Sequence, residues 1–154
     1  MLDRSILFAV LTCLAPGCGA FGVEHYREAA PSPELTIRFV ADDDHPAETT
    51  LNRLDGEAVG IAAGTIVSSD QIEHVRLLEA AEGGRVIVIV LRDAGRDRLR
   101  EATTDAAGRR IAIVVGPHVI AAPTVRGPLT DSEAYVAVPA RDVQRAYEAM
   151  TAPP

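Results

Sequence analysis

The fold is decided by residues 85–115, RVIVIVLRDAGRDRLREATTDAAGRRIAIVV. The first part, Arg85–Leu91, is apolar on both faces and predicts a central β-strand that is covered on each side. Asp93 then offers an N-cap, and Gly108 supplies a stop signal for a helix between them. Small and apolar side chains recur along one face of this helix: Leu99, Ala102, Thr103 and Ala106. Arg110–Val115 predicts the next strand, so the stretch is a strand, a helix and a strand.

Further elements are predicted on both sides of this unit. His74–Ala80 and Arg85–Leu91 flank Glu82-Gly83-Gly84, which is a hairpin signal. Ala41–Gly56 is polar and acidic and is expected to form a surface loop. The other expected strands are Glu34–Val40, Ala58–Val67, Val119–Ala122 and Ala134–Val138. Ser68-Ser69-Asp70 offers capping side chains for a short helical turn.

The chain is expected to close with an amphipathic helix over Ala140–Met150. Its apolar side chains recur at i, i+3, i+4 and i+7: Val143, Ala146, Tyr147 and Met150. Strands that cluster in hairpins around two helices predict the α+β class, with a mostly antiparallel sheet on which both helices pack.

The N-terminus is expected to carry a targeting signal that ends at Cys18. Ile6–Leu14 is apolar and follows Arg4, but it is shorter than the roughly 20 residues that a transmembrane helix needs. Cleavage before Cys18 would leave an acylated thiol at the mature start, so residues 1–18 are interpreted as a bacterial lipoprotein signal peptide. Two alternatives remain: a secretory signal cleaved after Ala20, or a buried first helix or strand with an ordinary cysteine.

Residues 19–33 hold Gly, Pro, Ser and mixed charges without periodicity, and are expected to be a flexible tether. Residues 34–150 then form one α+β domain. Cys13 and Cys18 both lie ahead of it, so the domain is expected to fold without a disulfide. The expected location is the extracytoplasmic face of a bacterial membrane, with the lipid bilayer as one partner.

Composition excludes some classes of partner. The formal net charge is −7, and a nucleic-acid backbone as partner would instead call for a basic face. Aromatic residues make up 4% of the chain and Trp is absent, which argues against stacking platforms for bases or sugars.

The densest polar cluster is Asp42-Asp43-Asp44-His45. Carboxylates suit hard cations and a histidine suits zinc, so a small secreted metal-dependent hydrolase is the alternative function. Four adjacent residues rarely direct their side chains to one ion, however, and the cluster is interpreted as a solvated acidic turn. No metal, cofactor or catalytic residue is therefore expected, and the protein is expected not to be an enzyme.

The remaining histidines and several serines lack the sequence neighbours that a metal site or a catalytic nucleophile would need. None of the histidines has a second ligand at i+4: His25, His74 and His118. No Gly-x-Ser-x-Gly elbow frames the serines, which are Ser68, Ser69 and Ser132. Ser69 has the simpler interpretation of a helix cap.

A family resemblance rests on several segments taken in order. They are LRDAGRDRL at 91–99, Thr103, GRRIAIV at 108–114, VIAAP at 119–123, Val125-Arg126, and Pro128-Leu129-Thr130. This pattern resembles the head subdomain of the first periplasmic domain of SecD and SecDF, over about Thr65–Met150. The residues that carry the structural motif are Gly95, Thr103, Gly108, Ala122 and Pro123.

The resemblance implies a function. SecD and SecDF couple proton flow through transmembrane helices to late steps of preprotein export, and their head is thought to engage the emerging chain or other envelope partners. This chain is therefore expected to be a lipid-tethered protein-binding module, with exported polypeptides or envelope proteins as partners, and not a proton-driven motor. Arg126 is the candidate partner contact; its alternative is a local ion pair with Asp131 or Glu133. A stand-alone decoy or inhibitor is a third function.

Overall fold

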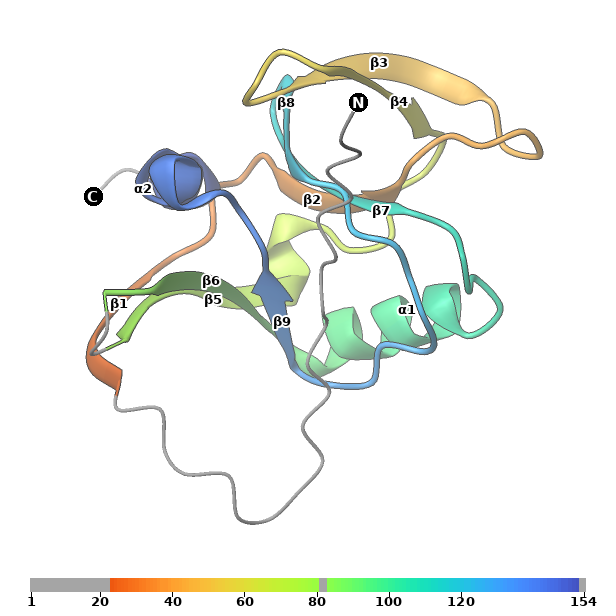
Figure 1. Ribbon diagram of the computed structural model, residues 1–154. Helices are drawn as coiled ribbons and strands as arrows, with labels where there is room; N and C mark the ends of the chain where they lie inside the picture. Colours follow the sequence, from red (N-terminus) through yellow and green to blue (C-terminus); the bar gives the residue numbers. More distant parts are fainter. Residues whose placement is uncertain (1–22, 81–82, 153–154) are drawn as a thin grey trace.

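The computed structural model describes residues 23–80 and 83–152, which form two sheets and two α-helices (Figure 1). The strands are β1 Val23–Ala29, β2 Leu35–Phe39, β3 Ala47–Arg53, β4 Ala58–Ala62, β5 Ile72–Ala80, β6 Arg85–Leu91, β7 Ile111–Val115, β8 His118–Ala121 and β9 Glu133–Val136. The helices are η1 Ser69–Gln71, α1 Asp93–Thr103, η2 Ala140–Asp142 and α2 Val143–Met150, where η marks a 3₁₀ helix. The predicted α+β class is confirmed.

The four-stranded sheet has the order β1-β5-β6-β9, and every pair in it is antiparallel. The predicted hairpin around residues 82–84 is confirmed as β5 and β6, with Leu77 opposite Ile87. β6 lies inside the sheet, as its continuous apolar sequence predicts. Five of its seven residues are buried.

The five-stranded sheet has the order β2-β7-β8-β3-β4, in which only β3 and β8 run parallel. This sheet curls so that its two outer strands, β2 and β4, approach each other. Val40, just beyond the end of β2, forms an isolated β-bridge with Ile61 in β4. The backbone N–H of Ala41 also donates to the carbonyl of Gly60 at 2.9 Å. One sheet was predicted and two are present, between which the predicted strands divide. β1 and β3 escaped prediction.

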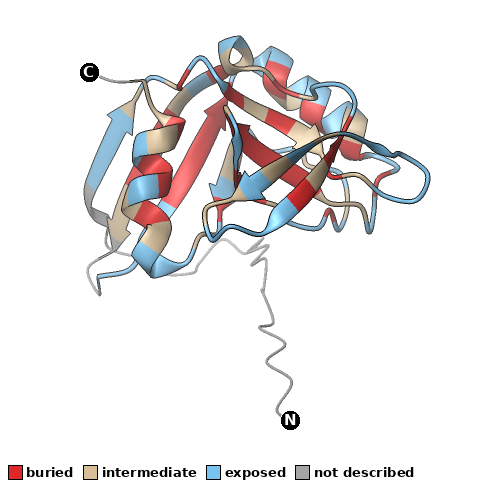
Figure 2. Ribbon diagram, turned by 90° about the horizontal axis from the view of Figure 1, so that it is seen from above, coloured by how far each residue is buried: buried red, intermediate tan, exposed pale blue. Residues whose placement is uncertain are grey.

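Two cores share the strand β7, because its side chains alternate between opposite faces. Ile111, Ile113 and Val115 point into the main core between the sheets, which α1 and α2 complete. Ala112 and Val114 point into a smaller core enclosed by the curled sheet. Figure 2 shows the buried residues of α2 along one side of the helix, the side that packs on the four-stranded sheet.

The predicted tether over residues 19–33 is wrong from Val23 onward. Residues 23–29 form β1, which pairs with β5 and sets Tyr26 opposite Leu78. Ser32 is buried, and its N–H donates to the carbonyl of Met150 at 2.8 Å. β1 escaped prediction because it is an edge strand that carries no apolar repeat, and Tyr26, Arg27 and Glu28 in it are exposed. Residues 19–22 and the predicted signal peptide lie outside the described residues.

Other boundaries also differ from those predicted. The expected loop Ala41–Gly56 contains β3, a polar strand whose residues are exposed or half-buried. The strand expected over Ala58–Val67 ends at Ala62, and Gly64 follows with a φ of +86°. The closing helix begins with a 3₁₀ turn before α2. These shifts leave the order of the remaining predicted elements unchanged.

Candidate functional site

Gly95 lets the first turn of α1 lie directly against η1. A Cβ atom at this position would lie 2.5 Å from the carbonyl oxygen of Gln71, closer than real Cβ contacts. That same carbonyl accepts a hydrogen bond of 2.9 Å from the N–H of Arg92, the N-cap of α1. The start of the helix is therefore fixed by backbone contact with the turn before β5.

Thr103 joins the end of α1 to a loop far along the chain. Its side chain is fully buried, and its hydroxyl donates to the carbonyl of Leu99 at 2.7 Å. The same oxygen accepts a hydrogen bond of 2.9 Å from the N–H of Leu129. One hydroxyl thus serves as donor and acceptor, which a threonine can do and a valine cannot.

A second anchor holds the other end of that loop. The N–H of Gly108, which has a φ of +88°, donates to the carbonyl of Val125 at 2.8 Å. Val125 is buried, and its own N–H donates to the carbonyl of Arg109 at 2.7 Å. We name residues 125–129 the Arg126 loop. Arg126 is exposed between the two anchored ends.

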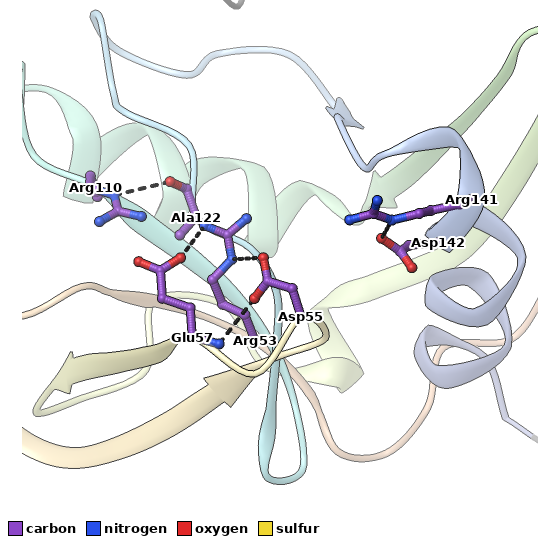
Figure 3. Close-up of polar contacts among 7 residues, drawn as sticks. All are labelled: Arg53, Asp55, Glu57, Arg110, Ala122, Arg141 and Asp142. Atoms are coloured by element: carbon purple, nitrogen blue, oxygen red, sulfur yellow. Dashed lines mark hydrogen bonds and ion pairs between the residues drawn. The ribbon is translucent and has the colours of Figure 1, made fainter. Parts of the chain in front are cut away.

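Ala122 and Pro123 extend the pairing alongside β7 past the end of β8. The Nε of Arg110 donates to the carbonyl of Ala122 at 3.2 Å (Figure 3). The N–H of Ile111 donates to the carbonyl of Pro123 at 3.0 Å. The structure therefore places all the motif residues in packing or backbone contacts, several of them around the Arg126 loop.

The acidic cluster forms a turn closed by Asp42. One carboxylate oxygen of Asp42 lies 2.8 Å from both the N–H and the Nδ1 of His45. The other oxygen accepts from the Nε of Arg109 at 2.8 Å, and the guanidinium of Arg109 lies 3.9 Å from the ring centre of Phe39. The hydrogen bond from His45 lowers the pKa of Asp42, and the charge of Arg109 adds to this effect.

The hydrolase alternative required the side chains of residues 42–45 to bind one metal ion together. Within the described ranges, no three His, Cys, Asp or Glu side chains are arranged to hold a metal. Contacts within the cluster instead converge on the carboxylate of Asp42, which accepts from the N–H groups of Asp44 and His45. That carboxylate closes a turn.

The other histidines lie on different elements. His25 lies in β1 opposite Glu79. His74 lies in β5, where its side chain is 13% exposed and its Nε2 is 3.3 Å from a carboxylate oxygen of Glu28. His118 is exposed at the start of β8. None of the three was expected to have a second ligand close by in sequence, and the structure places them on three different strands.

The serines make local contacts. The hydroxyl of Ser68 donates to the carboxylate of Asp70, and that of Ser69 donates to the carbonyl of Pro33 at 3.1 Å. The carbonyl of Ser132 accepts from a backbone N–H of β6 at 2.7 Å. The structure makes Ser68, rather than Ser69, the N-cap of η1.

A polar network on the four-stranded sheet was missed by the sequence analysis. Ile87, Ile89 and Leu91 belong to the main core, so the alternate residues of β6 point to the opposite side, which we name the outer face. There Arg76 on β5 reaches Glu28 on β1 at 3.2 Å and Glu133 on β9 at 2.9 Å.

The side chain of Arg76 crosses β6 to reach β9, which explains why Val88 beneath it is only 1% exposed. The hydroxyl of Tyr135 donates to Glu133 at 3.2 Å. Partial burial and the charge of Glu133 raise the pKa of Tyr135, so this donor keeps its proton at neutral pH. Glu28 lies in a segment that was interpreted as a tether, so its place beside Arg76 was not predicted.

Two open depressions flank α1, one beside Asp93 at its start and one between Phe39, Ile66 and Ala102. In the described part of the chain, neither helix has the length and apolar character needed to cross a bilayer.

Comparisons with known proteins agree with this geometry. The family described as SecDF, P1 head subdomain matches residues 47–144, more than half of the chain. The protein translocase subunit SecDF of Brucella abortus biovar 1 (strain 9-941) is 45% identical over 56 residues, which is 36% of this chain and 7% of that protein.

Two solved structures share the fold. One, described as a membrane component SecDF that enhances protein export, matches with a TM-score of 0.54 and 16% identity, over 77% of this chain and 61% of that chain. The other, SecDF in Super-membrane-facing form, matches with a TM-score of 0.50 and 18% sequence identity. This match covers 73% of this chain and 18% of that chain. This chain therefore spans less than two thirds of each of these relatives. The family match and the shared fold together show that the chain belongs to the SecDF P1 head subdomain family.

Proposed function

We propose that this protein is a lipid-anchored, extracytoplasmic protein-binding module that serves protein export. Membership of the SecDF head family supports the link to export, since one solved relative is described as enhancing protein export. The partners that this proposal favours are exported polypeptides, with other envelope proteins as the alternative.

The observation that carries the binding role is that Arg126 is exposed in a loop whose two ends are held by hydrogen bonds. Thr103 and Gly108 hold the two ends of the Arg126 loop by hydrogen bonds of 2.9 and 2.8 Å, while Arg126 itself is exposed. A loop that is already ordered loses less conformational entropy when a partner binds. Arginine also suits contacts with carboxylates and is enriched at energetically important positions of protein interfaces.

The membrane anchor is proposed from the sequence around Cys18. This residue follows an apolar run and a glycine, and it precedes Val23, where the described structure begins, by five residues. A diacylglyceryl group on its thiol would hold the folded part close to a bilayer, and two acyl chains are enough for stable anchoring. A secretory cleavage after Ala20 would remove Cys18 and leave the protein unanchored.

The anchor is tested by metabolic labelling of bacteria that express the full chain with a clickable palmitate analogue. The expected result is label on the wild-type protein and on Cys13→Ser, and none on Cys18→Ala. Cys13 is the matched control because it is the other cysteine of the chain. An unlabelled wild-type protein, or label that persists in Cys18→Ala, would contradict the anchor.

The binding role is tested by a photoreactive amino acid at position 126, introduced in the full chain. We expect a discrete crosslinked partner from this position and none from position 145, an exposed arginine on α2. Thr103→Val should weaken the crosslink because Leu129 loses its anchor, whereas Thr104→Val should not. The same background ladder from both positions would count against Arg126 as a contact.

A further inference from the structure

We infer that an apolar row on the outer face, formed by Tyr26, Leu78 and Val86, lies in the interfacial region of the bilayer to which Cys18 is anchored. This inference rests on the proposed lipid anchor and adds an orientation to it. The end of the four-stranded sheet that carries the row would face the membrane, and the five-stranded sheet would face away.

The row consists of direct cross-strand neighbours. Tyr26 on β1 is opposite Leu78 on β5, which is opposite Val86 on β6. Only three large hydrophobic side chains of the described residues are exposed, and two of them lie in this row: Tyr26 at 66% and Val86 at 41%. The helices bury their apolar sides in the main core, on the opposite side of the sheet.

The row lies at the end of the sheet that is nearest to Cys18 along the chain. Val23 is opposite Ala80, so β1 begins beside the end of β5 from which the chain turns towards β6. Val23 is the fifth residue after Cys18, and five residue steps span at most about 18 Å. An anchored Cys18 would therefore keep this end of the sheet within reach of the lipid headgroups.

Polarity along the outer face changes in the direction that such an orientation requires. Two residues further along the strands, about 7 Å away, the row of Glu28 and Arg76 carries the ion pairs described above. On the outer face, apolar side chains thus lie nearest the anchor and charged ones lie beyond them, whereas the ion pair of Arg85 and Glu79 at the same end belongs to the opposite face. This order suits a shallow contact with the interface and opposes deeper insertion.

A bilayer suits the row better than a second copy of the chain does. Tyrosine is enriched at membrane interfaces, where its ring is in contact with apolar groups and its hydroxyl with water. The row also has only three members, which is a small area for a stable protein dimer.

The chain contains no tryptophan, so single substitutions give clean fluorescent reporters. Tyr26→Trp and Val86→Trp report on the row. Tyr135→Trp is the matched control, because Tyr135 is on the same face, is 65% exposed and lies in the charged row opposite Val88. Each full-chain variant is purified from bacterial membranes and reconstituted in vesicles of phosphatidylethanolamine and phosphatidylglycerol, with or without phosphatidylcholine that is brominated on its acyl chains.

The expected result is a blue-shifted emission and a loss of intensity with brominated lipid at positions 26 and 86, and neither change at position 135. Intact-mass measurement of the same samples shows whether Cys18 carries lipid. Lipid on Cys18 with no quenching at 26 and 86 would overturn this inference and leave the anchor intact, whereas no lipid would overturn the anchor itself. A blue shift at 26 and 86 without quenching would show that protein covers the row, and would also overturn the inference.

Discussion

Gly95 occupies a position where the added methyl group of alanine has no space. Alanine favours a helix over glycine by up to about 1 kcal/mol. The Cβ atom would, however, lie 2.5 Å from a backbone oxygen that is fixed in the turn before β5, and relief of such an overlap typically costs about 1–3 kcal/mol. The overlap outweighs the gain in helix propensity.

Gly95→Ala should therefore lower the free energy of unfolding by about 1–2 kcal/mol, measured by urea denaturation. Gly127→Ala is the control, because no atom lies within 4 Å of its Cβ position and its φ is not positive, and it should change stability by less than about 0.5 kcal/mol. Equal stability of the two variants would show that α1 moves away from η1 without cost.

Asp42 provides a prediction on pH. Its pKa in the folded protein lies below the ordinary value of 3.8, mainly because His45 donates a hydrogen bond to it. The stabilisation from this carboxylate is therefore complete above pH 3.8 and is lost as the pH falls through the folded pKa. His45→Ala should raise the pKa of Asp42 towards its ordinary value.

A carbon-13 NMR titration of the Asp42 carboxyl group measures this change directly. His118→Ala is the control, since His118 is exposed in a turn away from the cluster, and it should leave the titration unchanged. An Asp42 midpoint that is the same in His45→Ala and in the wild type would assign the lowered pKa to the backbone N–H of residue 45 and to the charge of Arg109 instead.

At the scale of residues, Gly95, Thr103 and Gly108 were identified through the family resemblance, and Gly108 also as the stop signal of a helix. The sequence did not reveal their contacts. The partners of Thr103 and Gly108 lie in a loop that is 26 and 17 residues away along the chain, a separation that local spacing does not encode. The network of Arg76, Glu28 and Glu133 was missed for the same reason.

At the scale of elements, Arg76 ties both edge strands to the middle of the four-stranded sheet. Its partners Glu28 and Glu133 lie on β1 and β9, so loss of its charge removes one ion pair from each of the two edge strands. Arg76→Met keeps much of the apolar stem and removes the guanidinium. We expect a loss of about 1 kcal/mol, at the upper end for half-exposed ion pairs, and faster amide hydrogen exchange in β1 and β9.

Arg53→Met is the matched control for this prediction. Arg53 also has two acidic partners, Asp55 at 3.9 Å and Glu57 at 3.2 Å, but both lie in the turn between β3 and β4 (Figure 3). Its loss should cost less than about 0.5 kcal/mol and leave exchange in the four-stranded sheet unchanged. If exchange in β9 is unaffected by Arg76→Met, the ion pair contributes nothing to holding that edge.

Strongly apolar elements were predictable, and polar ones were not. β5, β6, β7 and α2 follow apolar runs or repeats, so the sequence located each of them to within a few residues. β1 and β3 are edge or near-edge strands with few buried side chains, and their backbone pairing leaves no periodic pattern to recognise. The division of the strands between two sheets was missed as well, because strand pairing joins residues that lie far apart along the chain.

At the scale of the whole molecule, the two cores should unfold together. β7 contributes alternate residues to both cores, so unfolding of one core removes the strand against which the other core packs. Ile61 in the smaller core and Ile89 in the main core are both fully buried. Substitution of either by alanine should cost about 2–5 kcal/mol.

Both variants should show one urea transition, with amide exchange accelerated in β4 and in β6 alike. Ile61→Val and Ile89→Val serve as mild controls, with losses of about 0.5–1.5 kcal/mol. If Ile61→Ala accelerates exchange only in β3 and β4, the curled sheet opens as a separate unit and the shared strand does not couple the two cores.

The two strands that precede the family match determine where the chain can be shortened. The match begins at residue 47, whereas β1 and β2 come before it and each forms the outer strand of a different sheet. A fragment trimmed to the matched region would leave β5 and β7 with unpaired backbone groups and would empty the sites of Leu35 and Ile37 in the main core. The smallest piece that folds independently is therefore longer than the recognisable signature.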